Sequence, residues 1–574
     1  MMKKIPYGES NFELIRNKNF LYVDKTHFIK QLESISKVIH LRPRRFGKSL
    51  FISMLESYYD VASADKFDEL FAGLYVHENL TGYQNSYYVL RLNFSGIATK
   101  DFDTIMNGFL NKVKESVDTF ISKYKLNIKL MDYGSPSVIL NALLEAMIRL
   151  NVPYKVYIMI DEYDHFTNAV LNNGLDDFMT LVRRGGAVRS FYEVIKEKCE
   201  TGIVERFFMT GVMSVSLDSM TSGFNIGTNI TTKKRFSDMM GFTSDEVKRI
   251  LKTMMQNSKK EGVRLTESEQ EEVYEIWKQN YNGYLFSEDS DVKIFNSTLI
   301  MYYLQAYVEE KKHPKSLLDP NLNQSGTTIK ILAELKNSEA NYEIVEEIVK
   351  ERVVSGELST FIDIDEKYDQ DDFITLLFNI GLLTIKEAGA LTRFEIPNKI
   401  IEAIYFQYLS ELEQRRLGYK LDTRKQRMAI VEMAENGKID KLTHLVSEFL
   451  AHTSGRNNIN FDEKYIKLIY LFIMSSTNQY FIYDEFPALR GYSDVVALKT
   501  PASYAQYEFL IELKHVKKGE KDETTEGRVE EKFAEGVKQI SEYMKDKRLA
   551  NRPDLKKFVI VFVGVEVARL EELE

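Results

Sequence analysis

Short apolar runs alternate with helical patterns through the first 240 residues of the chain. Four runs are rich in β-branched and aromatic residues, as buried strands are, and they lie at 37–41, 87–94, 155–160 and 206–211. Helical spacing of apolar residues lies between them, for example at 49–60 and 137–150. Strands that alternate with helices predict a largely parallel sheet covered on both faces. We therefore expect an α/β domain over residues 1–240.

The pattern changes after residue 240. Helical periodicity dominates residues 241–450, beginning with a capping-box pattern at Thr243 and Ser244, and strand candidates are few. The polar stretch 451–460 contains Ser454-Gly455 and is typical of a linker. We therefore expect a helical middle region at 241–450 and a separate domain at 451–574.

The last segment combines a third set of patterns. It predicts a helix at 462–476, strands at 480–485, 492–499 and 507–514, a helix at 533–546 and a final strand at 557–564. Residues 515–532 between them are densely charged, which predicts a solvated loop. A second, smaller α/β domain is therefore expected at the C-terminal end.

The composition is that of an ordinary soluble protein, with 44% hydrophobic and 28% charged residues. The net charge of −9 gives no general attraction for nucleic acid, so any anion-binding surface must be local. Cys199 is the single cysteine, which excludes a disulfide framework within the chain. The first residues lack the apolar core of a signal peptide, and the most apolar stretch is too short to span a bilayer. We expect a cytoplasmic protein without membrane contact, and the oligomeric state stays open.

Candidate chemistry begins directly after the first predicted strand. Gly47-Lys48-Ser49 is the end of a phosphate-binding loop, although Arg42 stands where the usual pattern has its first glycine. Gly47 would allow close approach of the backbone, Lys48 would be an exposed loop charge near the β- and γ-phosphates, and Ser49 would bind Mg²⁺. A bare Gly-Lys-Ser also occurs in basic turns, so the motif alone does not decide.

Two acids strengthen the nucleotide interpretation. The apolar strand at 155–160 ends in Asp161-Glu162. Asp161 would join the Mg²⁺ shell, and Glu162 would orient or deprotonate the attacking water. Together the two motifs predict an ATP site. Thr210, at the end of another strand, is a candidate γ-phosphate sensor, and an ordinary strand-ending threonine explains it equally well.

A second group of charged residues lies in the C-terminal segment. Glu512 and Lys514 are two apart on a predicted strand, so both side chains face the same side, and Asp494 lies in the preceding strand. Two carboxylates and a lysine would form an oxygen site for Mg²⁺ or Mn²⁺, in which Lys514 positions a water or stabilises developing charge. The pattern is a weak signal by itself. The alternative interpretation is that these three residues are exposed charges on an edge strand.

Several segments have a recognisable form, namely IPYGESNFELIRNKNFLYVDKTHFIKQL, RPRRFGKSL, IDEYD, FFMTGV and NYNGYLF. In them the chain resembles the prokaryotic AAA-ATPase-like family, whose members often carry a C-terminal PD-(D/E)XK nuclease domain. In that family R-P-R-R-F-G-K-[ST] is the usual loop, and V-D-K-T, here Asp24-Lys25-Thr26, is expected to be structural. The nucleotide-binding residues implied are Arg44, Arg45, Phe46, Gly47, Lys48, Ser49 and Leu50.

The resemblance extends to the arrangement of residues 460–564, which is similar to the PD-(D/E)XK fold. It implies a metal-dependent nuclease acting on DNA phosphodiesters, with Glu485 completing the metal shell of Asp494 and Glu512. Gln539 matches the family's glutamine on the following helix. The family's gene context implies a link to mobile elements or defence. Because DNA would need a local basic groove, we separately expect ATP to control the nuclease by moving residues 241–450.

Two other functions remain open on the sequence. One is a nucleotide switch that remodels or senses a partner, with an inactive nuclease fold that serves only in binding. The other is a nuclease whose phosphate loop binds nucleotide but barely hydrolyses it.

Overall fold

A computed structural model of the chain describes residues 3–98, 100–130, 134–164, 180, 186–213, 226–258, 266–319, 338–359, 362, 368–453, 462–483, 486–487, 492–517 and 524–574. The chain divides into two compact units, which are described separately. The first contains residues 1–308, 331–344 and 353–398, and the second contains residues 309–330, 345–352 and 399–574. No helix among the described residues is both long and apolar enough to cross a membrane.

The first unit is built on a five-stranded parallel sheet in the order β2-β3-β4-β1-β5. Its strands are β1 (Lys37–Leu41), β2 (Tyr87–Asn93), β3 (Lys155–Asp161), β4 (Val204–Gly211) and β5 (Thr228–Asn229). The four strands expected from the sequence are present, because apolar runs buried on both faces mark the strands of a parallel sheet clearly. β1 lies between β4 and β5, with β3 on the far side of β4, so the segments after β1 and β3 leave the same edge of the sheet.

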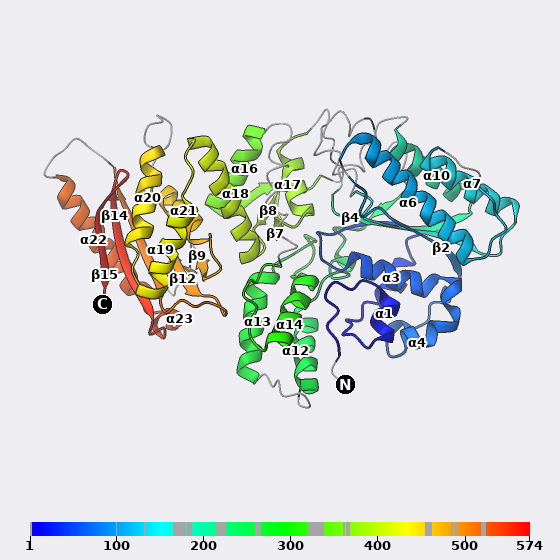
Figure 1. Cartoon of the computed structure of the whole chain (residues 1–574), viewed down its shortest axis with the longest axis horizontal. Coiled ribbons are helices and arrows are strands. Elements are labelled where there is room, and N and C mark those ends of the chain that lie inside the picture. The colour runs from blue at the N-terminus through cyan, green and yellow to red at the C-terminus, as the bar shows by residue number, and fades with distance from the viewer. Residues whose placement is uncertain are drawn as a thin grey trace. The chain divides into compact units, whose positions relative to one another are not determined.

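Helices cover both faces of this sheet (Figure 1). One face carries α6 (Phe102–Lys123), α7 (Pro136–Arg149) and α10 (Ala187–Glu200). The other carries α3 (Lys48–Tyr59), with α1 (Phe12–Asn17) and α4 (Phe67–Phe71) against it. The remaining short elements here are α2 (Phe28–Leu32), η1 (Val61–Lys66), α5 (Tyr75–Glu78) and η2 (Lys234–Phe236). The α/β class predicted for this domain is confirmed.

Helices dominate the middle of the chain, as expected. They are α12 (Ser244–Ser258), α13 (Glu267–Tyr281), α14 (Ser297–Glu310), α16 (Ser338–Glu351) and α17 (Gln370–Asn379). The sequence did not predict the three-stranded antiparallel sheet that accompanies them, β6 (Val353–Gly356), β8 (Thr392–Glu395) and β7 (Thr384–Glu387). Each of these strands has only four residues, which is too short for a period-two pattern to stand out.

The second unit contains a mixed five-stranded sheet in the order β15-β14-β13-β12-β9. The strands are β9 (Tyr480–Tyr483), β12 (Val495–Lys499), β13 (Glu508–Val516), β14 (Leu555–Val563) and β15 (Glu566–Leu573), with a separate pair formed by β10 (Phe486–Pro487) and β11 (Tyr492–Ser493). The helices are α18 (Lys399–Leu417), α19 (Thr423–Asn436), α20 (Asp440–Thr453), α21 (Glu463–Met474), α22 (Thr524–Tyr543) and α23 (Lys547–Ala550). β13 and β14 are parallel, and the other pairs are antiparallel.

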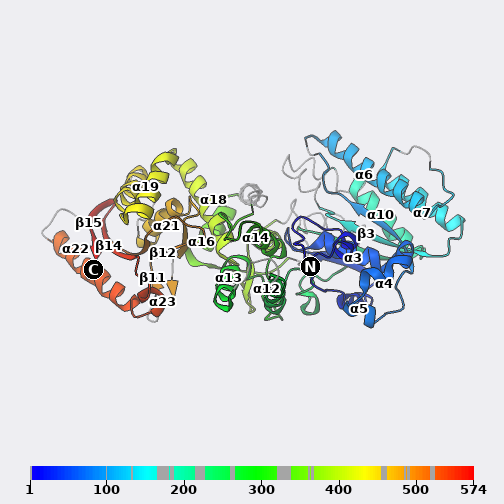
Figure 2. The same cartoon turned by 60° about the horizontal axis from the view of Figure 1, so that its bottom comes forward.

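The solvated loop expected at 515–532 is wrong for much of that range. β13 continues to Val516, and α22 begins at Thr524 and packs against β13, β14 and β15 (Figure 2). Val529 and Phe533, one helical turn apart, are buried in the core of this domain. The apolar spacing of Val529 and Phe533 makes this segment a packed helix, and the many charged residues around them lie on the other faces of the helix.

Candidate functional site

The phosphate-loop segment joins the end of β1 to the first turn of α3. Arg45 and Gly47 both have left-handed backbone conformations, with φ of 73° and 87°. Gly47 is the N-cap of α3, and no side chain caps the helix there. The first amides of a helix have no partner within the helix, and with the helix dipole they favour an anion. The local backbone is therefore suited to a phosphate group.

Lys48 is the first residue of α3 and is only 6% exposed, so the expectation of an exposed loop residue is wrong. Its ammonium donates to the backbone carbonyls of Arg42 and Pro43 over 3.0 and 2.9 Å, and the loop closes around it. Burial lowers the pKa of Lys48, against the opposing pull of the Asp164, Asp161 and Glu162 carboxylates. The lysine is therefore within electrostatic reach of the acids that follow β3.

Arg42, at the position of the missing first glycine, is a structural anchor for the loop. Its guanidinium is 1% exposed and donates to the carbonyls of Leu41, Thr231, Phe236 and Ser237. Backbone carbonyls that converge on a planar cation fix the strand that leads into the loop. The arginine thus takes a positioning role where a glycine would supply only flexibility.

The NYNGYLF segment packs beneath the same loop. Phe286 lies under the Arg42 guanidinium, 4.1 Å from ring centroid to Cζ. Phe46 is buried and makes edge-to-face contacts with Tyr284 and Phe286, at centroid distances of 4.9 and 5.4 Å. The resemblance implies that Phe46 binds nucleotide, but its side chain belongs to the core in this structure.

The acids predicted to hold the cation follow the end of β3. Asp161 is fully buried, and neither carboxylate oxygen has a hydrogen-bond partner in the described part of the chain. Glu162 has a φ of 51°, an uncommon conformation for a residue with a Cβ, and such strain is found at functional sites. Asp164, which the sequence analysis passed over, accepts from the amides of Val212 and Met213 after β4.

The other predicted nucleotide residues occupy varied positions. Arg44 is exposed, and Ser49 and Leu50 are half-buried on the first turn of α3. The hydroxyl of Thr210 donates to the backbone carbonyl of His40 on β1 over 2.7 Å, so it is engaged within the sheet. Its sensing role stays a prediction.

The Asp24-Lys25-Thr26 element has contacts that suit the structural role expected for it. The buried Lys25 ammonium donates to the Glu246 carboxylate and to the backbone carbonyl of Asp238, each over 2.8 Å. Asp24 accepts from the Thr26 hydroxyl and from the amide of Tyr75. These bonds join segments far apart in sequence within the first unit.

The second candidate site lies on β13 and the start of β12. Lys514 donates to Glu512 Oε1 over 2.7 Å and to the backbone carbonyl of Leu513 over 3.1 Å. Asp494 accepts from the amide of Leu513 over 2.9 Å, which fixes it beside this strand. Glu512 is 1% exposed, and its Oε2 has no hydrogen-bond partner among the described residues. The structure therefore brings the three predicted residues together.

The protonation states at this site are interdependent. Burial, and then repulsion from Asp494, raises the pKa of Glu512 to about 8. Burial also raises the pKa of Asp494, although the Leu513 amide and Lys514 oppose it. Burial alone would lower the pKa of Lys514, but Glu512, Glu463 and Asp494 together raise it. A buried carboxylate pair that resists ionisation would be stabilised by a cation between its members.

Two residues near this site, Glu463 and Tyr543, were not predicted, and the predicted Gln539 lies on the same helix as Tyr543. Glu463, the first residue of α21, has its Oε1 3.6 Å from Lys514 Nζ. Tyr543 on α22 is near enough for Glu512 to help raise its pKa, after burial. Gln539, one turn earlier, is half-buried, and its Oε1 has no partner in the described part of the chain. Gly536 lets α22 approach closely, because a Cβ there would meet Val559 at 2.7 Å.

The donor set fits a divalent cation that prefers oxygen ligands. A buried carboxylate oxygen without a partner and a second carboxylate beside it are what such an ion requires. Among the residues described here, no group of three or more His, Cys, Asp or Glu side chains has metal-holding geometry. Glu485, the acid expected to complete the shell, lies outside the described residues.

Comparison with known proteins gives a separate family match in the N-terminal and in the C-terminal part of the chain. Residues 6–221 match the family described as predicted AAA-ATPase, and residues 461–572 match the PD-(D/E)XK nuclease superfamily, so both domains predicted from the sequence are confirmed. A protein of Azotobacter chroococcum mcd 1, described as "Uncharacterized protein in vnfD 5'region", is 26% identical over 423 residues, which is 71% of each chain.

Among solved structures, the Walker-type ATPase PABY2304 of Pyrococcus abyssi is similar to this chain at a TM-score of 0.39 and 11% identity. The match covers 71% of this chain and 98% of that one.

Proposed function

We propose that the chain is a hydrolase with two sites. Its N-terminal domain binds and hydrolyses ATP with Mg²⁺, and its C-terminal domain cleaves DNA phosphodiester bonds with Mg²⁺ or Mn²⁺. The observation that carries the nuclease proposal is the buried grouping of Asp494, Glu512 and Lys514, in which one carboxylate oxygen of Glu512 has no partner among the described residues.

The roles of the three residues follow from their contacts. A divalent cation bound at the carboxylates would neutralise charge on a phosphate and activate a water. Asp494 is oriented for that purpose by the Leu513 amide, and Glu512 by Lys514. The Lys514 ammonium would turn from Glu512 and the Leu513 carbonyl to the water or the phosphate oxygen when substrate binds.

The nucleotide proposal is supported by the loop and the acids after β3. The amides at the start of α3 and the Lys48 ammonium would hold the phosphates, with Ser49 and Asp161 near the bound cation. Glu162 would orient the attacking water. The link to mobile elements or defence rests on the family resemblance alone, and control of the nuclease by ATP rests on the need for a local DNA-binding surface.

The test is a cleavage assay on linear and circular DNA and on RNA, with Mg²⁺, with Mn²⁺ and with EDTA, each with and without ATP. Wild type should cleave DNA only with metal, and Lys514→Ala should not cleave. Lys499→Ala is a matched control, since Lys499 is a strand lysine of the same sheet whose partner is the exposed Asp554.

The same assay, combined with measurements of ATP binding and steady-state ATP turnover, separates the rival functions. ATP turnover without any cleavage in wild type would favour the nucleotide switch with an inactive nuclease fold. Cleavage with nucleotide binding but negligible turnover would favour a nuclease whose phosphate loop only senses ATP. Cleavage that persists in EDTA would exclude the metal-dependent mechanism.

A further inference from the structure

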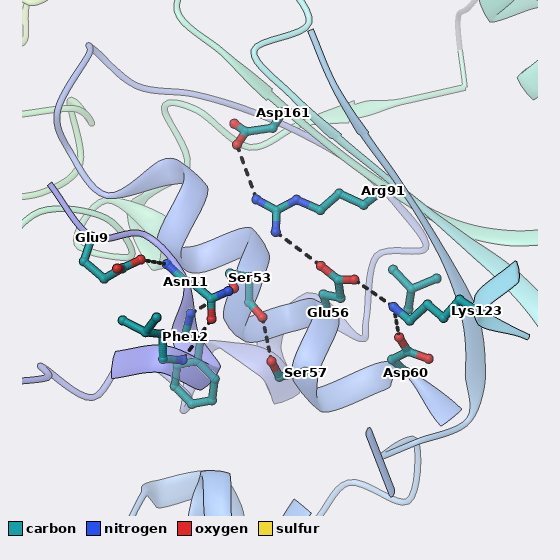
Figure 3. Close-up of polar contacts among 12 residues, drawn as sticks. Glu9, Asn11, Phe12, Ser53, Glu56, Ser57, Asp60, Arg91, Lys123 and Asp161 are labelled. Atoms are coloured by element: carbon teal, nitrogen blue, oxygen red, sulfur yellow. Dashed lines mark hydrogen bonds and ion pairs between the residues drawn. The ribbon is translucent and has the colours of Figure 1, made fainter. Parts of the chain in front are cut away.

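Arg91 lies in strand β2, an element that supplies none of the predicted nucleotide ligands. Its guanidinium nevertheless reaches the end of β3, where Nη2 lies 3.9 Å from Asp161 Oδ2 (Figure 3). The strands are parallel neighbours with Asn93 paired to Asp161, so Arg91 stands two residues before the acid's register position and on the same face. A charged side chain that is partly buried requires partners, and one of the partners of Arg91 is the proposed cation ligand.

Arg91 is held from its other side by helix α3. Its Nη1 lies 3.2 Å from Oε2 of Glu56, which stands eight residues after Lys48 on that helix. Glu56 Oε1 in turn lies 3.0 Å from the Lys123 ammonium at the end of α6, and Lys123 also pairs with the fully buried Asp60 (Figure 3). Positive and negative charges therefore alternate from Asp161 to the end of α6.

This arrangement places the Arg91 guanidinium beside the Asp161 carboxylate without a hydrogen bond between them. The carboxylate is fully buried, and a buried charge is costly unless another charge compensates it. Arg91 supplies that charge at a distance too long for a hydrogen bond, since its other guanidinium nitrogen is engaged by Glu56. Both oxygens of Asp161 consequently keep lone pairs for a cation.

We propose that Arg91 and Glu56 are positioning residues of the nucleotide site. Glu56 holds the guanidinium of Arg91 away from a hydrogen bond with Asp161, and Arg91 compensates the buried Asp161 carboxylate while leaving its oxygens to the cation that accompanies ATP. The inference rests on the proposed ATP site and adds a fixed link between α3, which begins at the phosphate loop, and the acid of β3.

The test is calorimetric binding of AMP-PNP, a nonhydrolysable ATP analogue, to the full chain in Mg²⁺ and in EDTA. The ratio of the two affinities measures the contribution of the metal without any turnover. Residues that support metal ligands change metal affinity by about 10–100-fold when altered. Arg91→Met and Glu56→Gln should therefore lower this ratio by about 10-fold or more, while affinity in EDTA stays near that of wild type, because the phosphate loop is untouched.

Further variants distinguish positioning from general stabilisation. Arg91→Lys keeps the charge and should recover part of the ratio. Lys66→Met removes the exposed Lys66–Glu13 pair of the same unit and should leave the ratio unchanged. If Arg91→Met does not fold, Glu56→Gln, which keeps the size of the side chain, decides alone.

Two results lead to different conclusions. A lowered melting temperature with an unchanged Mg²⁺ ratio in both variants would make Arg91 and Glu56 structural residues and overturn the inference. If wild type binds no AMP-PNP in either buffer, the ATP site itself is wrong, and this inference falls with it.

Discussion

The side chains of Lys514 and Glu512 project from the same face of β13, and the Lys514 ammonium donates to the Glu512 carboxylate over 2.7 Å. The second carboxylate oxygen has no hydrogen-bond partner among the described residues. One oxygen of this carboxylate is fixed by a hydrogen bond and the other has none. The carboxylate is therefore preorganised for a cation, because no protein contact of the second oxygen must break when the cation binds.

Removing any member of this group should eliminate cleavage. Asp494→Ala, Glu512→Ala and Lys514→Ala should each lower the rate roughly 10²–10³-fold or more, as the loss of a preorganised charge does. Combining them should cost little more, since residues that act as one unit are not additive. Initial rates on one DNA substrate with Mg²⁺ measure this. Full activity in Asp494→Ala, or additive losses, would contradict the shared site.

Metal binding should depend on pH through Glu512. Its pKa is raised to about 8 by burial and by Asp494, with Lys514 opposing and Glu463 and Tyr543 nearby. Between about pH 4.5 and 8 the folded, metal-free protein keeps a proton that the unfolded chain has lost, so this group lowers stability as the pH rises through that window. Metal must displace the proton, so Mn²⁺ affinity should rise up to about tenfold per pH unit below pH 8 and level off above it.

Calorimetric titration of Mn²⁺ across about pH 6–9 in two buffers of different ionisation enthalpy measures both the affinity and the proton released. Glu512→Gln should abolish the proton release. A flat profile in wild type would mean that Glu512 is already ionised before the metal binds.

The sequence predicted strands best where both faces of a strand are buried. β1 to β4 are apolar on both faces, and their positions agreed with the apolar runs within about two residues. β15 was missed because Glu566–Leu573 carries charges among its apolar positions, as an edge strand does. The first turns of α22 were missed because charges outnumber Val529 and Phe533, although these two carry the packing.

The candidate sites were predictable in their local parts and, for Asp494, from the expected pairing of adjacent strands. The phosphate loop, the acids after β3 and the Glu512-Lys514 pair are contiguous or two residues apart, so sequence alone brought them together. Arg91 lies 70 positions before Asp161, and Glu463 lies 51 positions before Lys514. Only the fold brings the members of each pair together. The one available signal for Arg91 was its charge inside the run YYVLRLNF.

Lys48 and Glu162 should separate nucleotide binding from turnover. Lys48→Ala should abolish tight ATP binding and also lower the free energy of unfolding by about 2 kcal/mol, because the carbonyls of Arg42 and Pro43 lose a charged donor. Glu162→Gln should keep ATP binding and lose turnover, since Asp161 remains near the metal. Calorimetry, denaturant unfolding and phosphate release measure the three quantities. Unchanged ATP affinity in Lys48→Ala would remove the loop from the site.

Arg42 should matter for folding more than for nucleotide chemistry. Arg42→Met leaves four converging carbonyls without their donor and should cost about 3–5 kcal/mol, the range for breaking a buried charged contact. Arg44→Met, at an exposed position of the same loop, should leave stability within about 0.5 kcal/mol of wild type. Urea unfolding of both variants measures the difference, and equal midpoints would show that Arg42 is not an anchor.

ATP should tighten DNA binding if the nuclease is under nucleotide control. A chain of net charge −9 has no general attraction for DNA, so binding depends on a local surface that nucleotide can organise. Coupling of this kind is typically about 5–150-fold, and linkage requires DNA to tighten ATP binding by the same factor. The double variant Glu162→Gln, Lys514→Ala should bind both ligands and destroy neither, so its DNA affinity, from fluorescence anisotropy at fixed salt, should rise when ATP is added. Adding Lys48→Ala to that background should remove the rise, and identical DNA curves with and without saturating ATP would show that the two sites bind independently.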